Sequence, residues 1–424
     1  MAATAIGIGD VSNALQKVIM PFIRDNYEEN TLLLDQVKKN SGVTFANDYF
    51  YADIRTSRHG GVTNLATDKA KLVSGSATVG QARVQPKIPT GTFDISKMVL
   101  DATKSSKGAV ENQLTFQART LAEDFAKHIN RQLLMDGSGI VSEVSSSANA
   151  SVIPVAVPTS SNDDGRALDR YGVINGDVGA VKYLFPWNVI GIGTAAAAVA
   201  TIAAAGVADG GTVGTITLSA GTAHAANDAI FLLDGDTTGA GSAEIEGLGK
   251  ALTSATANYA NLARSTFGWT PQYSTVSGAL TLSDMEDKYL SATEYAQPED
   301  MYAIFVNKTL YKKYGDLLTA MRRTVNKTEL VAGWTGLEFT MGVGKNMNVA
   351  VFLDRNVPDG ECIIVNLDSL TIAQVSDMDW MENPDGGALN RRDDYITYQA
   401  TMHWFLNLIC LAPAANAKLM RRTD

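Results

Sequence analysis

The chain has 424 residues, of which 45% are hydrophobic and 19% are charged, and its formal net charge at pH 7 is −10. This length is enough for two or three packed regions, and the acidic balance argues against a protein that wraps nucleic acid over its whole surface. The alanine-rich run over 194–208 is too short and too weakly apolar to span a membrane, which needs about 20 strongly apolar residues.

The charge is unevenly distributed along the chain. Residues 51–107 contain nine Lys or Arg and four Asp, a net charge of +5, whereas residues 190–262 contain six acidic residues and one Lys, a net charge of −5. Oppositely charged surfaces on one molecule favour self-association through unlike faces. The alternative is that both are ordinary solvated surfaces, on which ion pairs contribute little.

The first hundred residues predict an arm followed by an extended loop. One or two short helices are expected over 10–39, and an aromatic extended segment over 43–56. Residues 57–80 are rich in Gly, Ser, Thr and Lys, and we expect a loop tip there. From Gln81 the pattern has period two and turns at Pro89-Thr90-Gly91, which predicts a β-arm. Because an isolated two-stranded ribbon is marginal in water, we expect this arm to lie on another copy of the chain.

A long amphipathic helix is predicted from about Gly108 to Asp136. At 1.5 Å per residue it would be roughly 40 Å long, and Gly137 and Gly139 follow it as terminating residues. Its apolar residues recur every three or four positions and form one stripe; they are Val110, Leu114, Ala118, Leu121, Phe125, Ile129 and Leu133.

The middle of the chain changes composition. Residues 140–190 read as loop-rich, whereas 191–262 are rich in Ala, Gly and Thr, with short strands predicted over 214–219 and 228–234. We interpret 191–262 as a small β insertion; the alternative is a disordered linker. From Thr281 an α/β pattern begins, and a single long strand is predicted over 395–411.

Motifs for catalysis, metal binding or cofactor binding are not convincing. The segment Gly191–Ala196 fits a loose dinucleotide pattern, but Pro186 weakens the strand expected before it and later glycines weaken the helix expected after it. The segment Gly342–Asn346 lacks the first glycine of a phosphate loop. Cys362 and Cys410 lie in apolar runs and are expected to be buried free thiols. The four histidines lack metal-ligand spacing; they are His59, His128, His224 and His403. We therefore predict no enzyme activity, no metal and no cofactor.

In their order, these segments resemble the major capsid proteins of tailed double-stranded DNA bacteriophages, which have the Hong Kong 97 capsid fold. The best local matches are Phe93–Leu100, which leads into Phe125–Gly137, and Ala400–Pro413 near the C-terminus. The strand pair before Gly247-Leu248, followed by Ala263-Arg264-Ser265, is similar to an insertion in many phage coat proteins.

The resemblance implies an α+β fold of the Hong Kong 97 type, divided into six parts. These are an N-terminal arm (1–45), an extended loop with its return strands (46–100), a spine helix with the peripheral domain (101–190), the β-rich insertion (191–262), an axial domain (263–375), and a long peripheral-domain strand with the C-terminal return (376–424).

The resemblance also implies a function. The chain would form pentamers and hexamers of an icosahedral shell that encloses double-stranded DNA without sequence-specific binding, in a virion assembled in the bacterial cytoplasm and without a membrane. No long charged helical segment precedes the arm, so a separate scaffolding protein is expected beside a portal. Isopeptide cross-link positions of some members find no match in this sequence, and none is carried over.

The extended loop holds the residues predicted to contact other subunits. Basic residues would contact acidic neighbours, and apolar residues of the β-arm would pack on another copy; together they are Arg55, Arg58, Lys69, Lys71, Val84, Ile88 and Phe93. Two alternatives remain open from the sequence. One is a phage tail, fibre or surface-layer binding protein, and the other is an enzyme whose site is assembled only in space.

Overall fold

The structure is a computed structural model, and two compact units are distinguished in it. The first contains Thr90–Lys127 and Met378–His403, and the second contains Asn30–Pro89, His128–Asp377 and Trp404–Asp424. The residues that the structure describes are 32–40, 42–64, 74–98, 113–137, 140–144, 148–156, 189–192, 198–206, 213–225, 228–232, 244–253, 257–276, 278–320, 327–329, 335–339, 349–354, 356–357, 360–382, 389–391, 395–420 and 422–423.

The first unit is built on an antiparallel strand pair. Strand β5 (Thr90–Ser96) pairs with β24 (Thr397–His403) along its whole length, and the short strands β22 (Asp379–Trp380) and β23 (Asn390–Arg391) also pair with β24. Helix α4 (Gln113–Leu134) lies against β5, because a Cβ on Gly91 would be 3.0 Å from the Leu121 side chain. The ring of Phe93 meets that of Trp380 edge-on at 6.0 Å.

Two strand predictions in this region are wrong. The predicted β-arm does not fold on itself, since β4 (Val79–Val84) pairs with β3 (Tyr49–Arg55) and β5 pairs with β24. The predicted long strand over 395–411 ends at His403, and β25 (Leu406–Cys410) joins another sheet. Alternation identifies residues that form strands, but it does not identify the partner strand, which tertiary packing decides.

The long amphipathic helix is confirmed over the described part, Gln113–Leu134. Phe125, Ile129 and Leu133 of the predicted stripe are buried, and Gly137 follows the helix with φ +79°. The arm helices predicted over 10–39 fall outside the described residues except α2 (Leu32–Gln36). The side-chain oxygen of Asn130 in α4 accepts hydrogen bonds from Leu33 N–H at 3.1 Å and Leu34 N–H at 3.0 Å, so α4 satisfies the first amides of α2.

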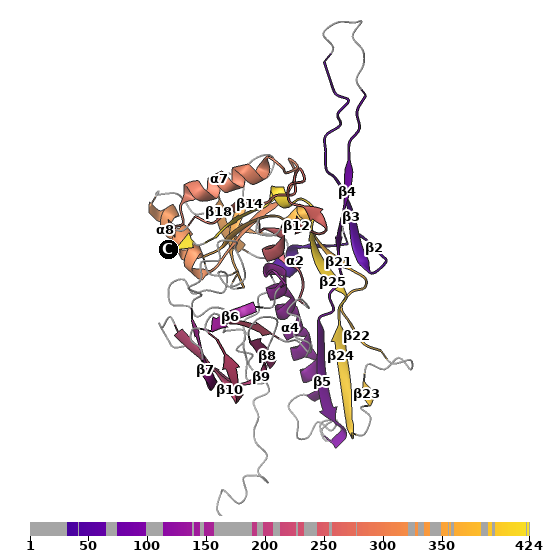
Figure 1. The fold of residues 1–424 in the computed structure, drawn as a ribbon, viewed down its shortest axis with the longest axis vertical. Coiled ribbons are helices and arrows are strands. Elements are labelled where there is room, and N and C mark those ends of the chain that lie inside the picture. Colours follow the sequence, from indigo (N-terminus) through magenta and orange to yellow (C-terminus); the bar gives the residue numbers. More distant parts are fainter. Residues whose placement is uncertain are drawn as a thin grey trace, which may run out of the picture. The chain divides into compact units, whose positions relative to one another are not determined.

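The main sheet of the second unit confirms the predicted α/β pattern (Figure 1). Helices α7 (Leu282–Thr293) and α8 (Lys308–Ala320) share one core with the side chains of Tyr302, Ile304 and Val306. Both helices therefore cover the same face of the sheet. The sheet has seven strands in the order β14 (Gln272–Ser274), β26 (Ala417–Leu419), β20 (Cys362–Asn366), β16 (Tyr302–Val306), β19 (Val349–Leu353), β18 (Thr335–Phe339) and β17 (Lys327–Glu329).

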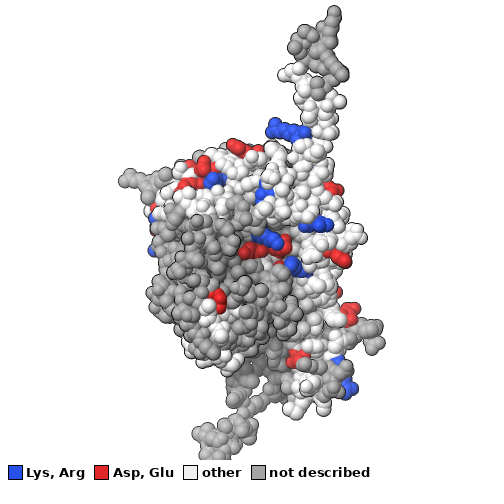
Figure 2. All heavy atoms as spheres, viewed as in Figure 1, with Lys and Arg blue, Asp and Glu red and all other residues white. Residues whose placement is uncertain are grey.

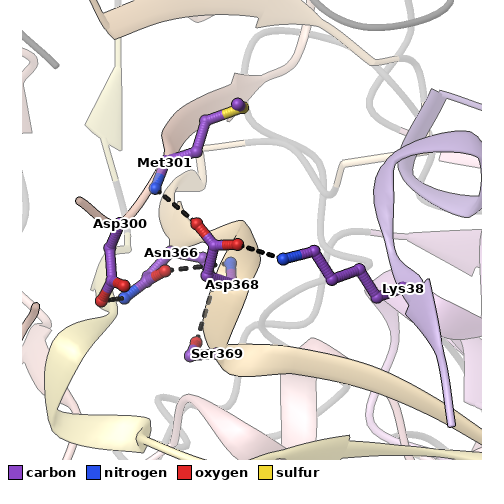
Figure 3. A network of polar contacts seen from close by, with 6 residues as sticks. All are labelled: Lys38, Asp300, Met301, Asn366, Asp368 and Ser369. Atoms are coloured by element: carbon purple, nitrogen blue, oxygen red, sulfur yellow. Dashed lines mark hydrogen bonds and ion pairs between the residues drawn. The ribbon is translucent and has the colours of Figure 1, made fainter. Parts of the chain in front are cut away.

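A three-stranded sheet brings a segment near the start of the described chain together with two strands from its C-terminal part. Strand β1 (Lys38–Lys39) runs parallel to β21 (Leu370–Gln374), which pairs with β25. Lys38 forms an ion pair with Asp368, which also accepts a hydrogen bond from Met301 N–H at 2.7 Å, as Figure 3 shows. Asp368 lies in the 3-10 helix η3 (Leu367–Ser369), which directly follows β20, and Met301 directly precedes β16. This network therefore fastens the N-terminal segment to the ends of two interior strands of the main sheet.

A closed barrel forms between α4 and the main sheet in sequence. Its strands follow the order β10 (Val213–His224), β7 (Ala148–Ala156), β6 (Ile140–Val144), β11 (Ala229–Leu232), β8 (Val189–Ile192) and β9 (Ala198–Gly206). The two strands predicted near 214–219 and 228–234 are confirmed, whereas the loop-rich reading of 140–190 is wrong for β6 and β7. Strands β8 and β9 are antiparallel, so Gly191 does not open the βαβ unit of a dinucleotide site.

The remaining short elements lie between these parts. They are α6 (Leu248–Ala251), β12 (Asn258–Tyr259), β13 (Leu262–Ala263), β15 (Gly278–Ala279), the 3-10 helix η4 (Pro413–Ala415) and β27 (Arg422–Thr423). Cys362 and Cys410 are both free and buried, as predicted. Within the described residues, no helix combines the length and the apolar character that a membrane span requires.

Candidate functional site

The described residues within 44–84 form a long β-ribbon, called the ribbon below. Its foot is the three-stranded antiparallel sheet of β2, β3 and β4 (Figure 1). Strand β2 (Thr44–Ala46) turns into β3 through Asn47 and Asp48, which have φ values of 46° and 63°. Two consecutive residues with positive φ make the turn that matches strand twist, and Asn and Asp tolerate this conformation. Strand β3 then pairs with β4 from Phe50↔Val84 to Arg55↔Val79.

The foot of the ribbon is held by the body of the second unit. Phe50 and Val84 are 1% and 3% exposed, and the N–H of Arg83 donates to the carbonyl of Ala260 at 2.9 Å. The guanidinium of Arg83 also lies 5.0 Å from the ring centroid of Tyr49. These contacts fix where the ribbon leaves the body.

A buried arginine stabilises the segment around Tyr259 and Ala260 that contacts the foot of the ribbon. Arg264 donates to the carbonyl oxygens of Lys250 at 2.7 Å and Ala251 at 2.8 Å, so it satisfies the end of α6. Its guanidinium lies 4.8 Å from the Tyr259 ring centroid. Burial lowers the pKa of Arg264, and the nearby Tyr259 opposes this shift.

Beyond β3 and β4 the two backbone segments of the ribbon continue side by side. Thr56 N–H donates to the carbonyl of Thr78 at 2.9 Å, and Thr78 N–H donates to Ser57 Oγ at 2.8 Å. Further along, a Cβ on Gly75 would stand 2.3 Å from the carbonyl carbon of Gly60. Only a residue without a side chain allows the two backbones to approach so closely.

A hollow of about 640 Å³ opens beside the ribbon, lined by Arg55, Ser57, Arg58, His59, Val62 and Phe267. Arg55 Nε donates to the carbonyl of Ser57 at 2.8 Å, and among the described residues neither Arg55 nor Arg58 has a carboxylate partner. Val62 is 85% exposed and Phe267 is 57% exposed. The hollow therefore combines two cations with uncovered apolar surface, which is the chemistry of an acidic, partly apolar partner.

The structure places the predicted contact residues in different surroundings. Arg55 and Arg58 line the hollow, whereas Lys69 and Lys71 lie outside the described residues. Val84 is covered within its own chain. The remaining two are Ile88, which is 54% exposed, and Phe93, which is half-buried against Trp380 in the first unit.

Two residues that line the hollow, Val62 and Phe267, were not predicted from the sequence as contact residues. Val62 is a single apolar residue in a polar loop, and Phe267 follows a short strand some two hundred residues later. No spacing connects them to Arg55, and only the fold brings them together. The basic residues were found because charge accumulates locally in sequence.

The described residues show no arrangement typical of catalysis. They contain no group of three or more His, Cys, Asp or Glu side chains that could hold a metal ion. The N–H of Gly61 donates to Nδ1 of His59 at 3.1 Å, an arrangement local to the ribbon. Burial raises the pKa of the Cys410 thiol to about 11, so this cysteine is not a thiolate near neutral pH.

A solved structure shares this architecture over nearly the whole chain. A chain of the capsid asymmetric unit of Cyanophage A-1(L) matches with a TM-score of 0.54 and 12% identity, covering 97% of this chain and 98% of that one. The chain has the Hong Kong 97-like capsid fold. The α+β fold expected from the sequence is therefore confirmed.

Two further similar structures give lower scores. The capsid of a native GTA particle matches with a TM-score of 0.49 and 10% identity, over 100% of both chains. The encapsulin SrpI from Synechococcus elongatus matches with a TM-score of 0.47 and 9% identity, over 100% of this chain and 97% of that one. No protein-family model matches the sequence. No curated protein matches it either.

Proposed function

We propose that this chain is a structural subunit that assembles with copies of itself into an icosahedral phage capsid around double-stranded DNA. The observation that carries the proposal is the full-length correspondence of its fold with the capsid subunit of Cyanophage A-1(L). The proposed role is structural rather than catalytic.

The ribbon is the part of the chain that contacts a neighbouring subunit. Val62 and Val79 of the ribbon are 85% and 68% exposed, and Ile88, which follows it, is 54% exposed. Arg55 and Arg58 have no carboxylate partner among the described residues. Apolar and charged groups of this kind gain contacts when a second copy covers them. Lys69 and Lys71 would add to the positive charge of the same ribbon.

Other partners follow from the same function. A separate scaffolding protein and a portal would guide pentamers and hexamers into a closed shell in the bacterial cytoplasm, and the virion would be the final location. The net charge of −10 suits a wall that encloses DNA without gripping it in a sequence-specific way.

Sedimentation velocity and negative-stain electron microscopy of the purified chain, alone and together with its scaffolding protein, test the proposal. We expect hollow shells, with rings of five and six copies as assembly intermediates. A chain that stays monomeric under both conditions would contradict it. An elongated oligomer without a shell would instead support a tail or fibre protein.

The ribbon is tested separately by replacing residues 56–78 with an Asn-Gly turn, which preserves the β3–β4 pairing from Phe50↔Val84 to Arg55↔Val79. We expect soluble subunits that no longer close into shells, because the surface that covers the neighbour is missing. Near-ultraviolet circular dichroism that matches the intact chain serves as the control for folding. Shells of normal size after this replacement would refute the assigned role of the ribbon.

A further inference from the structure

The residues that line the hollow indicate the chemistry of a partner that would fit it. Arg55 and Arg58 would form ion pairs with carboxylates, and the exposed side chains of Val62 and Phe267 would pack against an apolar side chain. An α-helix can offer both on one stripe, because residues three and four apart lie next to each other on its surface.

Helix α7 carries such a stripe on the same unit. Its buried face consists of Leu282, Met285, Tyr289 and Ala292. At 100° per residue, the positions on the opposite face are Asp284, Asp287, Leu290, Ser291 and Glu294. The Asp287 side chain is 72% exposed and Leu290 is 42% exposed, so carboxylate and apolar surface lie together.

Charge around α7 is strongly acidic. Residues 282–300 contain six acidic residues and one Lys, which gives a net charge of −5. Figure 2 shows acidic side chains gathered over α7 and basic side chains at the foot of the ribbon. Lys288 is the one cation of this segment. Its Nζ lies 3.9 Å from Oδ2 of Asp287, and its side chain is 24% exposed, so the segment keeps a net negative charge.

The stripe of the same chain cannot fill the hollow. Tyr295, just beyond the end of α7, packs against Phe267 with 6.1 Å between ring centroids, so the hollow lies at the C-terminal end of the helix. At 1.5 Å per residue, Asp284 is about 16 Å from Tyr295 along the helix, and Asp287 is about 12 Å away. Leu290 is still about 8 Å from Tyr295 along the helix, so the stripe from Asp284 to Leu290 is available to another molecule.

We infer that the hollow of one copy receives the outer stripe of α7 from a second copy, centred on Asp287 and Leu290. The inference rests on the proposed function and specifies its contact: Arg55 and Arg58 meet the carboxylates, while Val62 and Phe267 meet Leu290. Because hollow and stripe are different surfaces, the contact is heterologous and propagates from copy to copy until a ring closes.

Charge reversal tests this contact. The hollow variant carries Arg55→Glu and Arg58→Glu, and the stripe variant carries Asp287→Arg and Ser291→Arg. Each places like charges opposite each other, and we expect the ratio of assembled to free subunits to fall about tenfold or more. A chain with all four substitutions restores opposite charges with exchanged signs, and we expect it to recover most of the assembly.

Two controls separate this contact from a general charge effect. Lys308→Glu with Lys312→Glu makes the same charge change as the hollow variant at exposed positions of α8. Glu286→Arg reverses a carboxylate on the flank of α7, about 100° from Asp287 around the helix axis. We expect both controls to assemble like the unmodified chain.

Sedimentation velocity of the folded variants decides between the outcomes. Failure of the unmodified chain to assemble would contradict the proposed function itself. If the unmodified chain assembles, hollow and stripe variants that assemble equally well would overturn the inference. A four-substitution chain that remains folded and does not recover assembly would overturn it as well, because the two surfaces would then act on different partners.

Discussion

Gly247 lies against the carbonyl groups at the end of α4, where a Cβ on this residue would stand 2.3 Å from the carbonyl oxygen of Gln132. The same Cβ would be 2.5 Å from the carbonyl oxygen of Met135, which accepts a hydrogen bond from Gly249 N–H at 3.0 Å. The chain that returns from the barrel therefore packs on the C-terminal end of the long helix and donates a hydrogen bond to the carbonyl group of Met135.

Replacing Gly247 with alanine is expected to destabilise the protein by about 3 kcal/mol, because the backbone of α4 or of the returning chain must move to admit a methyl group. Urea denaturation monitored by circular dichroism measures the change. Gly315→Ala is the matched control. Nothing lies within 4 Å of a Cβ there, and alanine in the interior of α8 should stabilise by roughly 0.5–1 kcal/mol. Equal effects of the two substitutions would refute the close fit.

Arg131 and Glu244 join the same helix end to the returning chain. Their side chains form an ion pair and are only 3% and 5% exposed. Arg131→Met leaves a buried carboxylate without its partner, and we expect a loss of about 3–5 kcal/mol. The double variant Arg131→Met with Glu244→Leu removes both charges and should be much less destabilised.

A double-mutant cycle in urea measures the coupling between these two side chains. The exposed pair Arg119–Glu123, with 3.7 Å between its charged atoms, is the control, and Arg119→Met should cost less than about 1 kcal/mol. Additive effects of the Arg131 and Glu244 substitutions would contradict a direct interaction.

Local sequence pattern predicts those helices and strands whose burial follows from the spacing of their own apolar residues. The stripe of α4 is an example, because Phe125, Ile129 and Leu133 recur at helical spacing and are all buried. Strand β16 is another, since five consecutive apolar residues leave no solvent-facing side. In both cases hydrophobic periodicity and burial give the same answer.

Pairings between distant segments lie beyond such patterns. The alternation at Val84 predicts a strand but not its partner Phe50, and β6 could not be foreseen because its partners β7 and β11 are needed to close the barrel. The candidate site shows the same limit. Arg55 and Arg58 are conspicuous in sequence, whereas Phe267 joins them only through the fold.

The ion pair of Lys38 and Asp368 predicts a pH dependence of stability (Figure 3). Burial of Asp368 raises its pKa, but hydrogen bonds from Lys38 and from Met301 N–H together hold the pKa below its ordinary value. Between the lowered pKa of the folded state and the ordinary pKa of the unfolded state, the unfolded chain binds more protons than the folded chain. The free energy of unfolding therefore rises with pH over this interval. The contribution is present above about pH 4 and is lost as the pH falls through the lower folded pKa.

Urea denaturation between acidic and neutral pH checks this dependence. Asp368→Asn should be less stable near neutral pH, and the difference from the unmodified chain should shrink as the solution becomes acidic. Lys38→Met is the matched control, because it removes one of the two hydrogen bonds and should have a smaller effect in the same direction. A difference that stays constant over the whole pH range would contradict the assignment.

The barrel is expected to be dispensable for folding of the body, because the chain enters and leaves it at one place. A Cβ on Gly137, before the barrel, would be 3.0 Å from the carbonyl oxygen of Ile245, after it. Every described barrel strand pairs with other barrel strands, so its removal exposes no edge of the main sheet. Adjacent ends and a closed set of hydrogen bonds are typical of an inserted unit.

We expect replacement of residues 138–243 by a short Gly-Ser linker to give a soluble chain that retains Gly137 and Glu244 and assembles as before. Removing residues 140–156 alone is the matched control. It deletes β6 and β7 and leaves β10 and β11 with open edges, so this variant should aggregate. Light scattering measures aggregation, and negative-stain microscopy measures assembly. A full replacement that folds but forms no shells would show that the barrel contributes to contacts between subunits, because the body would then be intact without being sufficient.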